Sequence, residues 1–225
     1  MAQTVAYSLL GPEALFYPYL LLMRVANLLL VSLLSGLGLL ASCRTDYTDL
    51  PTFSKERHLL QMVVEVPAGT NHEQRYSPAT HSFQPLQQAG VERMVEFLPF
   101  PGNYGFIPGT RVATAGVNIT ADQPLPVLVL AECEAAGTVT EVLPLAMVLL
   151  DIDGTLEQVV IAVPARPGQR ILPDVTDWAT LTRRYPAVRQ SLGLWFQHRN
   201  SPRPVRIAGW KDEKYAEQQI RAQMQ

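Results

Sequence analysis

A stretch of ten residues at positions 100–109, FPGNYGFIPG, is the part of the sequence whose residue types most directly suggest chemistry. Its Gly-Asn pair is typical of a turn, and Tyr104 stands between that pair and a second glycine. A tyrosine hydroxyl can both donate and accept a hydrogen bond. The stretch therefore predicts a loop with one aromatic polar group at its centre.

Other catalytic patterns are missing from the sequence, which contains no HExxH, GxxxxGK[ST], GxSxG or CxxC motif. The histidines lack ligand spacing, and we interpret each as a surface or hydrogen-bonded residue; they are His58, His72, His81 and His198. Cys133 is predicted to be a buried small apolar residue. Because Cys43 is the only other cysteine, no disulfide within the domain is expected.

The composition is typical of one globular domain with an N-terminal appendage. The chain has 225 residues, of which 48% are apolar and 17% charged, and its formal net charge is −2. No cluster of Lys and Arg is present, and a phosphate backbone is normally met by a basic stripe. These features argue against disorder and against a nucleic-acid partner.

The N-terminus has the three parts of a secretory signal in MRVANLLLVSLLSGLGLLASC, which begins at Met23. Its last residues, Leu40 to Cys43, resemble a bacterial lipobox, which predicts lipidation of Cys43 and a lipid-anchored protein of the cell envelope. An uncleaved anchor is the alternative, although the uncharged run is shorter than the ~20 residues of a span. We expect residues 1–43 to be the signal, with translation starting at Met23, and residues 44–58 to be a polar tether.

In the mature domain, residues 59–225, the sequence predicts strands first and helices last. Short apolar runs bounded by Pro, Gly and Asn predict strands: LLQMVVEVPA, VERMVEFLPF, LPVLVLAEC, TVTEVLPLAMVLLDIDG and LEQVVIAVPA. Asp153-Gly154 predicts a hairpin turn. Beyond Pro173 the pattern becomes helical, with a helix from Pro186 to about His198 and another in GWKDEKYAEQQIRAQM. The fold class is therefore α+β.

Five segments, in order from about Met62 to the C-terminus, resemble the soluble inorganic pyrophosphatase family: VVEVPAGTN, FPGNYGFIPG, QPLPVLVL, VIAVP, and AGW with its following helix. The resemblance implies a small five-stranded OB-like barrel with flanking C-terminal helices. It also implies hydrolysis of diphosphate with Mg²⁺, which is held by acidic side chains at one end of the barrel. Glu65 and Tyr104 are the catalytic-site residues that this chain keeps.

The family's metal ligands are only partly retained. Its three signature aspartates fall on Ala121, Gln123 and Pro126, unless a one-residue insertion brings Asp122 onto the central one. The other carboxylates that the resemblance implies as ligands are Asp151, Asp153 and Glu157 in DIDGTLE. Asp153 could instead serve only the turn.

The phosphate-binding residues also change. A family lysine falls on Glu73 and an acidic ligand on Arg75, so the two charges are reversed. Arg93 is retained, and Arg199 stands one residue before the family's terminal lysine. If a small anion binds, we expect Arg75, Arg93 and Arg199 to hold it.

Two possible functions follow from the resemblance and from the replaced residues. In the first, the protein is an exported pyrophosphatase with weak or lost Mg²⁺-dependent hydrolysis of diphosphate. In the second, it is a non-catalytic lipoprotein that binds another anion or has a structural role. Relatives often form oligomers, and the sequence leaves the oligomeric state open.

Overall fold

The computed structural model describes residues 46–112, 123–199 and 204–225. Its β-strands are β1 (Leu60–Val66), β2 (Gln74–Ser77), β3 (Ser82–Pro85), β4 (Gln87–Gln88), β5 (Val91–Glu92), β6 (Asn103–Val112), β7 (Gln123–Val129), β8 (Val139–Ile152), β9 (Thr155–Pro164) and β10 (Val205–Asp212). Its helices are η2 (Tyr47–Asp49), η3 (Pro167–Gln169), α2 (Trp178–Arg184), α3 (Pro186–His198) and α4 (Glu213–Ala222). The expected signal segment, with Cys43, lies outside the described residues.

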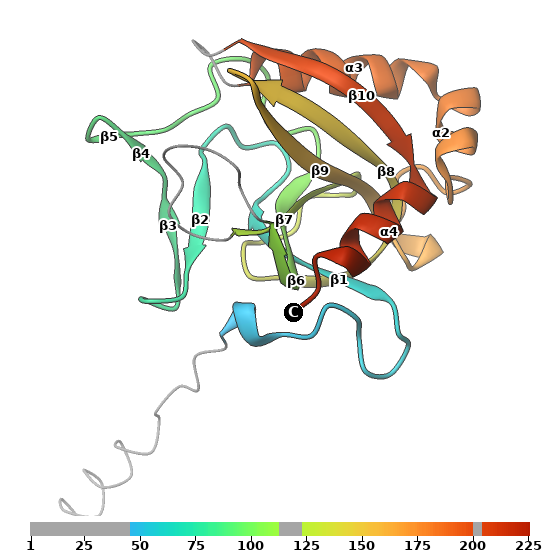
Figure 1. Cartoon of the computed structure of the whole chain (residues 1–225), viewed down its shortest axis with the longest axis horizontal. Coiled ribbons are helices and arrows are strands. Elements are labelled where there is room, and N and C mark those ends of the chain that lie inside the picture. Colours follow the sequence, from blue (N-terminus) through green and yellow to red (C-terminus); the bar gives the residue numbers. More distant parts are fainter. Residues whose placement is uncertain (1–45, 113–122, 200–203) are drawn as a thin grey trace, which may run out of the picture. The chain divides into compact units, whose positions relative to one another are not determined.

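Five strands form a closed ring. The main sheet has the order β1-β6-β7-β9-β8-β10, and a further pairing joins β1 to β8, which closes five strands into a ring and leaves β10 outside it. Among the strands of the described ranges, only β7 and β9 pair in parallel. Figure 1 shows α2 and α3 beside β10. A ring of five strands with helices after it agrees with the expected fold.

Strand β9 shows why the apolar runs of the sequence fold as strands. Its residues Val159, Ile161 and Val163 belong to the core that also contains Trp195 and Phe196 of α3. The alternate residues, Val160 and Ala162, belong to a second core that includes Ala216 and Ile220 of α4. Successive side chains of a strand point to opposite faces, so a strand buried on both faces needs a continuous apolar run.

The predicted hairpin turn and the predicted start of α3 are both confirmed. Asp153 and Gly154 have positive φ angles of 52° and 82° between β8 and β9, which a type I′ turn requires. Helix α3 begins at Pro186 and ends at His198, the limits expected from the sequence. The segment GWKD was expected to be helical, but it ends β10, and α4 begins only at Glu213.

The FPGNYGFIPG stretch is a strand from Asn103 onward, which corrects the expectation of a loop. Asn103 is buried and joins two loops, since its amide donates to the carbonyl of Glu132 and its oxygen accepts from the backbone N–H groups of Ala68 and Glu134. Gly105 faces the Val63 carbonyl so closely that a Cβ would overlap it. The glycines and asparagine of this motif therefore serve packing.

Two expectations about the remaining chain are also corrected. The described part of the expected tether, residues 46–58, packs on the domain: Thr52 is buried and donates to the carbonyl of Pro108 at 2.9 Å. Cys133, expected to be buried, is exposed. Within the described ranges, no helix is both long and apolar enough to cross a membrane.

Replacing Gly105 with alanine should destabilise the domain, because the added Cβ collides with rigid backbone of β1. We expect a loss of about 3 kcal/mol in the free energy of unfolding, measured by urea denaturation. Gly209→Ala is the matched control, since Gly209 also lies in a strand but has nothing within 4 Å of its Cβ position. Equal effects of the two substitutions would contradict this account.

Candidate functional site

Arg199, directly after α3, lies against three aromatic rings. Its backbone N–H donates to the carbonyl of Trp195 at 2.9 Å, which continues the helical path for one residue. The guanidinium carbon lies 5.2 Å from the ring centre of Tyr104 and 5.4 Å from those of Trp195 and Phe196. At these distances the faces of aromatic rings attract a cation. The end of α3 thus directs a positive charge toward β6.

Buried Glu73 forms an ion pair with the partly exposed side chain of Arg93. Glu73 is 6% exposed, and its Oε2 lies 2.6 Å from Nε of Arg93. The two backbones are also joined, because the N–H of Glu73 donates to the carbonyl of Arg93 at 3.1 Å. The hairpins carrying these residues therefore fix a carboxylate and a guanidinium together.

Arg199 stays charged although it is partly buried. Burial alone would lower the pKa of Arg199, but the nearby Tyr104 hydroxyl and the carboxylates of Glu73 and Glu157 raise it above its ordinary value. Together with Arg93, these side chains make a set of two cations and two anions. We call Glu73, Arg93, Glu157 and Arg199 the charge cluster; the formal charges of its two carboxylates and two guanidinium groups sum to zero.

One buried hydrogen-bond donor of the charge cluster has no oxygen acceptor. The Nε of Arg199 is buried and has no hydrogen-bond partner among the described residues. An Arg side chain that bound a carboxylate in a bidentate manner would normally use this group. Arg199 therefore acts here mainly through its charge and its contacts with the aromatic rings.

The carboxylates expected to bind a metal ion each have different neighbours. Asp151 accepts a hydrogen bond from the N–H of Gly154 and pairs with Arg206, while Asp153 is exposed in the hairpin turn. Of this set, Glu157 is the carboxylate whose charge raises the pKa of Arg199. Within the described ranges, no group of three or more His, Cys, Asp and Glu residues could hold a metal ion.

The described part of the segment that aligns with the family's signature aspartates, Gln123–Val129, offers few side-chain oxygen atoms as metal ligands. Gln123 and Pro126 lie on β7, where Pro126 is opposite Phe106 of β6. Ala121 and Asp122 lie outside the described residues. The described carboxylates of this set therefore do not fit Mg²⁺, which prefers several hard oxygen ligands, because Asp151 is paired with Arg206, Asp153 lies in the exposed turn and no group of three or more ligands forms among the described residues.

Glu65 and Tyr104, the expected catalytic residues, have different partners. Tyr104 contacts Arg199 and the ring of Phe100, whereas Glu65 accepts a hydrogen bond from the backbone N–H of Tyr76 at 2.8 Å. Burial raises the pKa of Glu65 to about 7, although this hydrogen bond and the charge of Arg75 oppose the rise. At neutral pH this carboxyl is protonated about half of the time.

The expected anion-binding arginines are not brought together as one free site. Arg75 is exposed on β2 and acts electrostatically on Glu65, whereas Arg93 and Arg199 belong to the charge cluster. The cluster was not predicted from the sequence, because Glu73 was interpreted only as a reversal of charge at the position of a family lysine. The signal was present in the reversed charge at position 73 and the retained arginine at 93.

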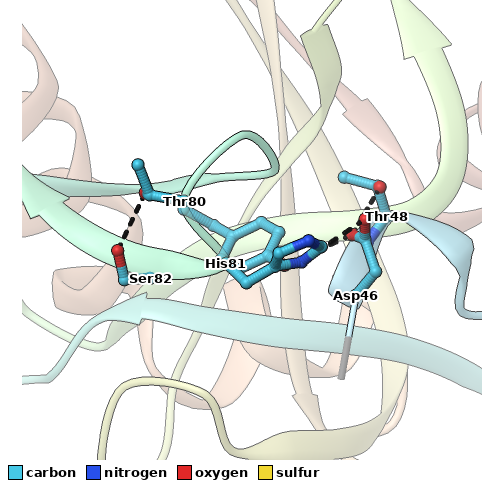
Figure 2. Close-up of polar contacts among 6 residues, drawn as sticks. Asp46, Thr48, Thr80, His81 and Ser82 are labelled. Atoms are coloured by element: carbon cyan, nitrogen blue, oxygen red, sulfur yellow. Dashed lines mark hydrogen bonds and ion pairs between the residues drawn. The ribbon is translucent and has the colours of Figure 1, made fainter. Parts of the chain in front are cut away.

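A second polar cluster holds the N-terminal segment. Figure 2 shows the His81 ring directed toward Asp46, whose carboxylate also accepts from the Thr48 hydroxyl. Nδ1 of His81 lies 3.7 Å from the Asp46 carboxylate and 3.2 Å from the Tyr76 hydroxyl. The Ser82 hydroxyl is engaged with Thr80 at 2.9 Å, so this set is not arranged as a nucleophile and base.

Comparisons with known proteins agree on one family. A family model described as inorganic pyrophosphatase matches residues 62–225. The inorganic pyrophosphatase of Thermus thermophilus is 29% identical over 189 residues, covering 77% of this chain and 93% of that protein. The Mesorhizobium japonicum enzyme of the same name is 28% identical over 169 residues, covering 72% and 85%. A crystal structure of the Thermus thermophilus protein gives a TM-score of 0.65 at 25% identity, covering 79% of this chain and 96% of that one.

The raised pKa of Glu65 predicts how Glu65→Gln depends on pH. Between pH 4.5 and about 7 the unfolded chain loses this proton while the folded chain keeps it, so the contribution of Glu65 to stability falls as pH rises. The neutral glutamine avoids this loss. Urea denaturation should therefore show the variant more stable than the wild type at pH 8, by up to roughly 3 kcal/mol, with little gain at pH 4.

Glu56→Gln, at an exposed carboxyl, is the control for this experiment. Its difference from the wild type should be the same at both pH values. A pH-independent effect of Glu65→Gln would show that Glu65 ionises normally in the folded protein.

Proposed function

The chain belongs to the inorganic pyrophosphatase family, and on this premise we propose that its Mg²⁺-dependent hydrolysis of diphosphate is weak or lost. The observation that carries the proposal is the charge cluster. Diphosphate hydrolysis needs an activated water molecule and positive charge to balance the phosphates, both of which the metal supplies in a metal-dependent enzyme. Here Glu73 is bound to Arg93 and Glu157 lies beside Arg199.

The remaining residues do not replace the metal's chemistry. A guanidinium attracts anions but cannot bind water as a Lewis acid, so it does not generate hydroxide at neutral pH. The protonation of Glu65 near neutral pH also limits its use as a base. Because each lost transition-state donor can cost ~10²–10³ in rate, several losses together leave little activity.

The second candidate is a non-catalytic domain, and the neutrality of the charge cluster favours a structural role over anion binding. Two carboxylates offset Arg93 and Arg199, so the cluster has no net attraction for diphosphate or another small anion. An anion would have to displace Glu73 from Arg93 or Glu157 from the vicinity of Arg199. Partner binding and oligomerisation remain compatible with this role.

We further propose that the domain is tethered outside the cytoplasmic membrane by lipid on Cys43. The support is the order of a basic residue at Arg24, an uncharged run and Leu-Ala-Ser-Cys. Diphosphate is mainly a by-product of biosynthesis inside cells, so its scarcity at that location is consistent with relaxed selection on hydrolysis.

A phosphate-release assay tests the catalytic part of the proposal. With Mg²⁺ and diphosphate, the protein should release phosphate at least ~10²-fold more slowly than the Thermus thermophilus enzyme assayed in parallel. Any residual release is assigned to this site only if Tyr104→Phe reduces it. Turnover comparable to that of the Thermus enzyme would refute the proposal.

Metabolic labelling with a radioactive fatty acid tests the anchor. In a bacterial host the wild type should incorporate label and remain with membranes, whereas Cys43→Ser should do neither, because the thiol that carries the lipid is gone. Cys133→Ser is the matched control and should be labelled normally. Equal labelling of the wild type and Cys43→Ser would exclude lipidation at this residue.

A further inference from the structure

We propose that one face of the domain, made of residues 46–49 and the β2–β3 turn at residues 78–81, lies against the phospholipid headgroups of the membrane that holds the anchor. We call these residues the anchor face. The inference rests on the proposed lipidation of Cys43 and adds to it the surface that the membrane contacts.

The chain is fixed to the domain from its first described residue. The Asp46 carboxylate accepts a hydrogen bond from the Thr48 hydroxyl at 2.7 Å, and Nδ1 of His81 lies 3.7 Å from it (Figure 2). The same carboxylate accepts from the Tyr76 hydroxyl at 3.3 Å. The ring of Tyr47 packs edge-on against that of Tyr76, with 5.1 Å between the ring centres. Asp46 and Tyr47 are therefore held on the β2–β3 hairpin.

The rest of residues 46–58 also stays on the domain. Thr52 is 4% exposed, and its hydroxyl donates to the carbonyl of Pro108 at 2.9 Å. Its own carbonyl accepts from the backbone N–H of Gln61 at 2.9 Å. Moving this segment into solvent would break buried hydrogen bonds, which is unfavourable. The segment therefore adds nothing to the reach of the anchor.

The length of the free linker decides which face meets the membrane. Two residues, Arg44 and Thr45, separate Cys43 from Asp46. The three steps from Cys43 to Asp46 span at most about 11 Å. The headgroup layer of one leaflet is about 5–8 Å thick, and a small domain is about 30 Å across. Because the linker is much shorter than the domain, it brings the anchor face to the headgroups and keeps the opposite end away.

The composition of the anchor face fits zwitterionic headgroups. Its ranges contain Asp46, Asp49 and His81 but neither Lys nor Arg, whereas a surface that binds anionic lipids by charge carries several basic residues. Residues 78–80, Pro-Ala-Thr, are exposed and uncharged. Attachment then depends on the lipid at Cys43, and the anchor face only contacts the headgroups.

Fluorescence quenching by lipids with a nitroxide in the headgroup tests this orientation. The lipidated protein, in vesicles of zwitterionic phospholipid, carries a dye on one added cysteine, with Cys133→Ser to remove the other free thiol. Ala79→Cys places the dye on the exposed β2–β3 turn. Ser191→Cys places it on an exposed position of α3, which lies at the opposite end of the domain in Figure 1. The dye at position 79 should lose a fraction of its fluorescence at least about twice that lost at position 191.

Inserting about twenty Gly and Ser residues between Arg44 and Thr45 is the matched control, because such a linker spans roughly 25 Å and lets the domain turn freely. Fatty-acid incorporation at Cys43 should be the same as without the insertion. Quenching at position 79 should fall to the level seen at position 191. Unchanged quenching at position 79 would contradict the argument from linker length.

Two further results would overturn the inference, and the mass of the N-terminal peptide distinguishes them. If Cys43 carries lipid but the two dyes are quenched equally, or position 191 more strongly, the anchor face is wrong while the proposed anchor stands. If Cys43 carries no lipid, the anchor and the orientation both fail.

Discussion

Burying a charged side chain is unfavourable unless an opposite charge lies close to it, and this requirement determines how the side chains around Glu73 and Arg93 are arranged. Glu73 is buried, and its Oε2 lies 2.6 Å from Nε of Arg93. Arg199 is held by aromatic rings near Glu73 and Glu157. The formal charges of this cluster cancel, in a family that generally depends on metal ions, and our proposal is that this leaves little attraction for either a metal ion or diphosphate.

The fold brings these charges together from distant parts of the chain. Hairpins before β6 supply Glu73 and Arg93, the β8–β9 hairpin supplies Glu157, and α3 ends at Arg199. Strand β6 contributes Tyr104. Its neighbouring residues Asn103 and Gly105 serve packing, so the stretch that most resembles an active-site loop is needed by the ring of strands irrespective of catalysis.

The sequence predicted those elements whose signals are local. The Asp153-Gly154 turn and the start of α3 at Pro186 follow from backbone preferences, and the double-sided burial of β9 follows from its unbroken apolar run. It did not predict β10, because GWKD has no strand pattern by itself and is ordered by pairing with β8. The exposure of Cys133, the packing of residues 46–58 and the pairing of Glu73 depend on contacts between segments far apart in sequence, which a local pattern does not encode.

Crystals of the protein grown with Mn²⁺ and diphosphate would test charge compensation most directly, because Mn²⁺ prefers the same oxygen ligands as Mg²⁺ and gives an anomalous signal. The account predicts the Arg199 guanidinium near Glu73 and Glu157, with no anomalous peak within bonding distance of either carboxylate. A Mn²⁺ ion coordinated by these carboxylates, with Arg199 displaced toward solvent or onto the diphosphate, would contradict it.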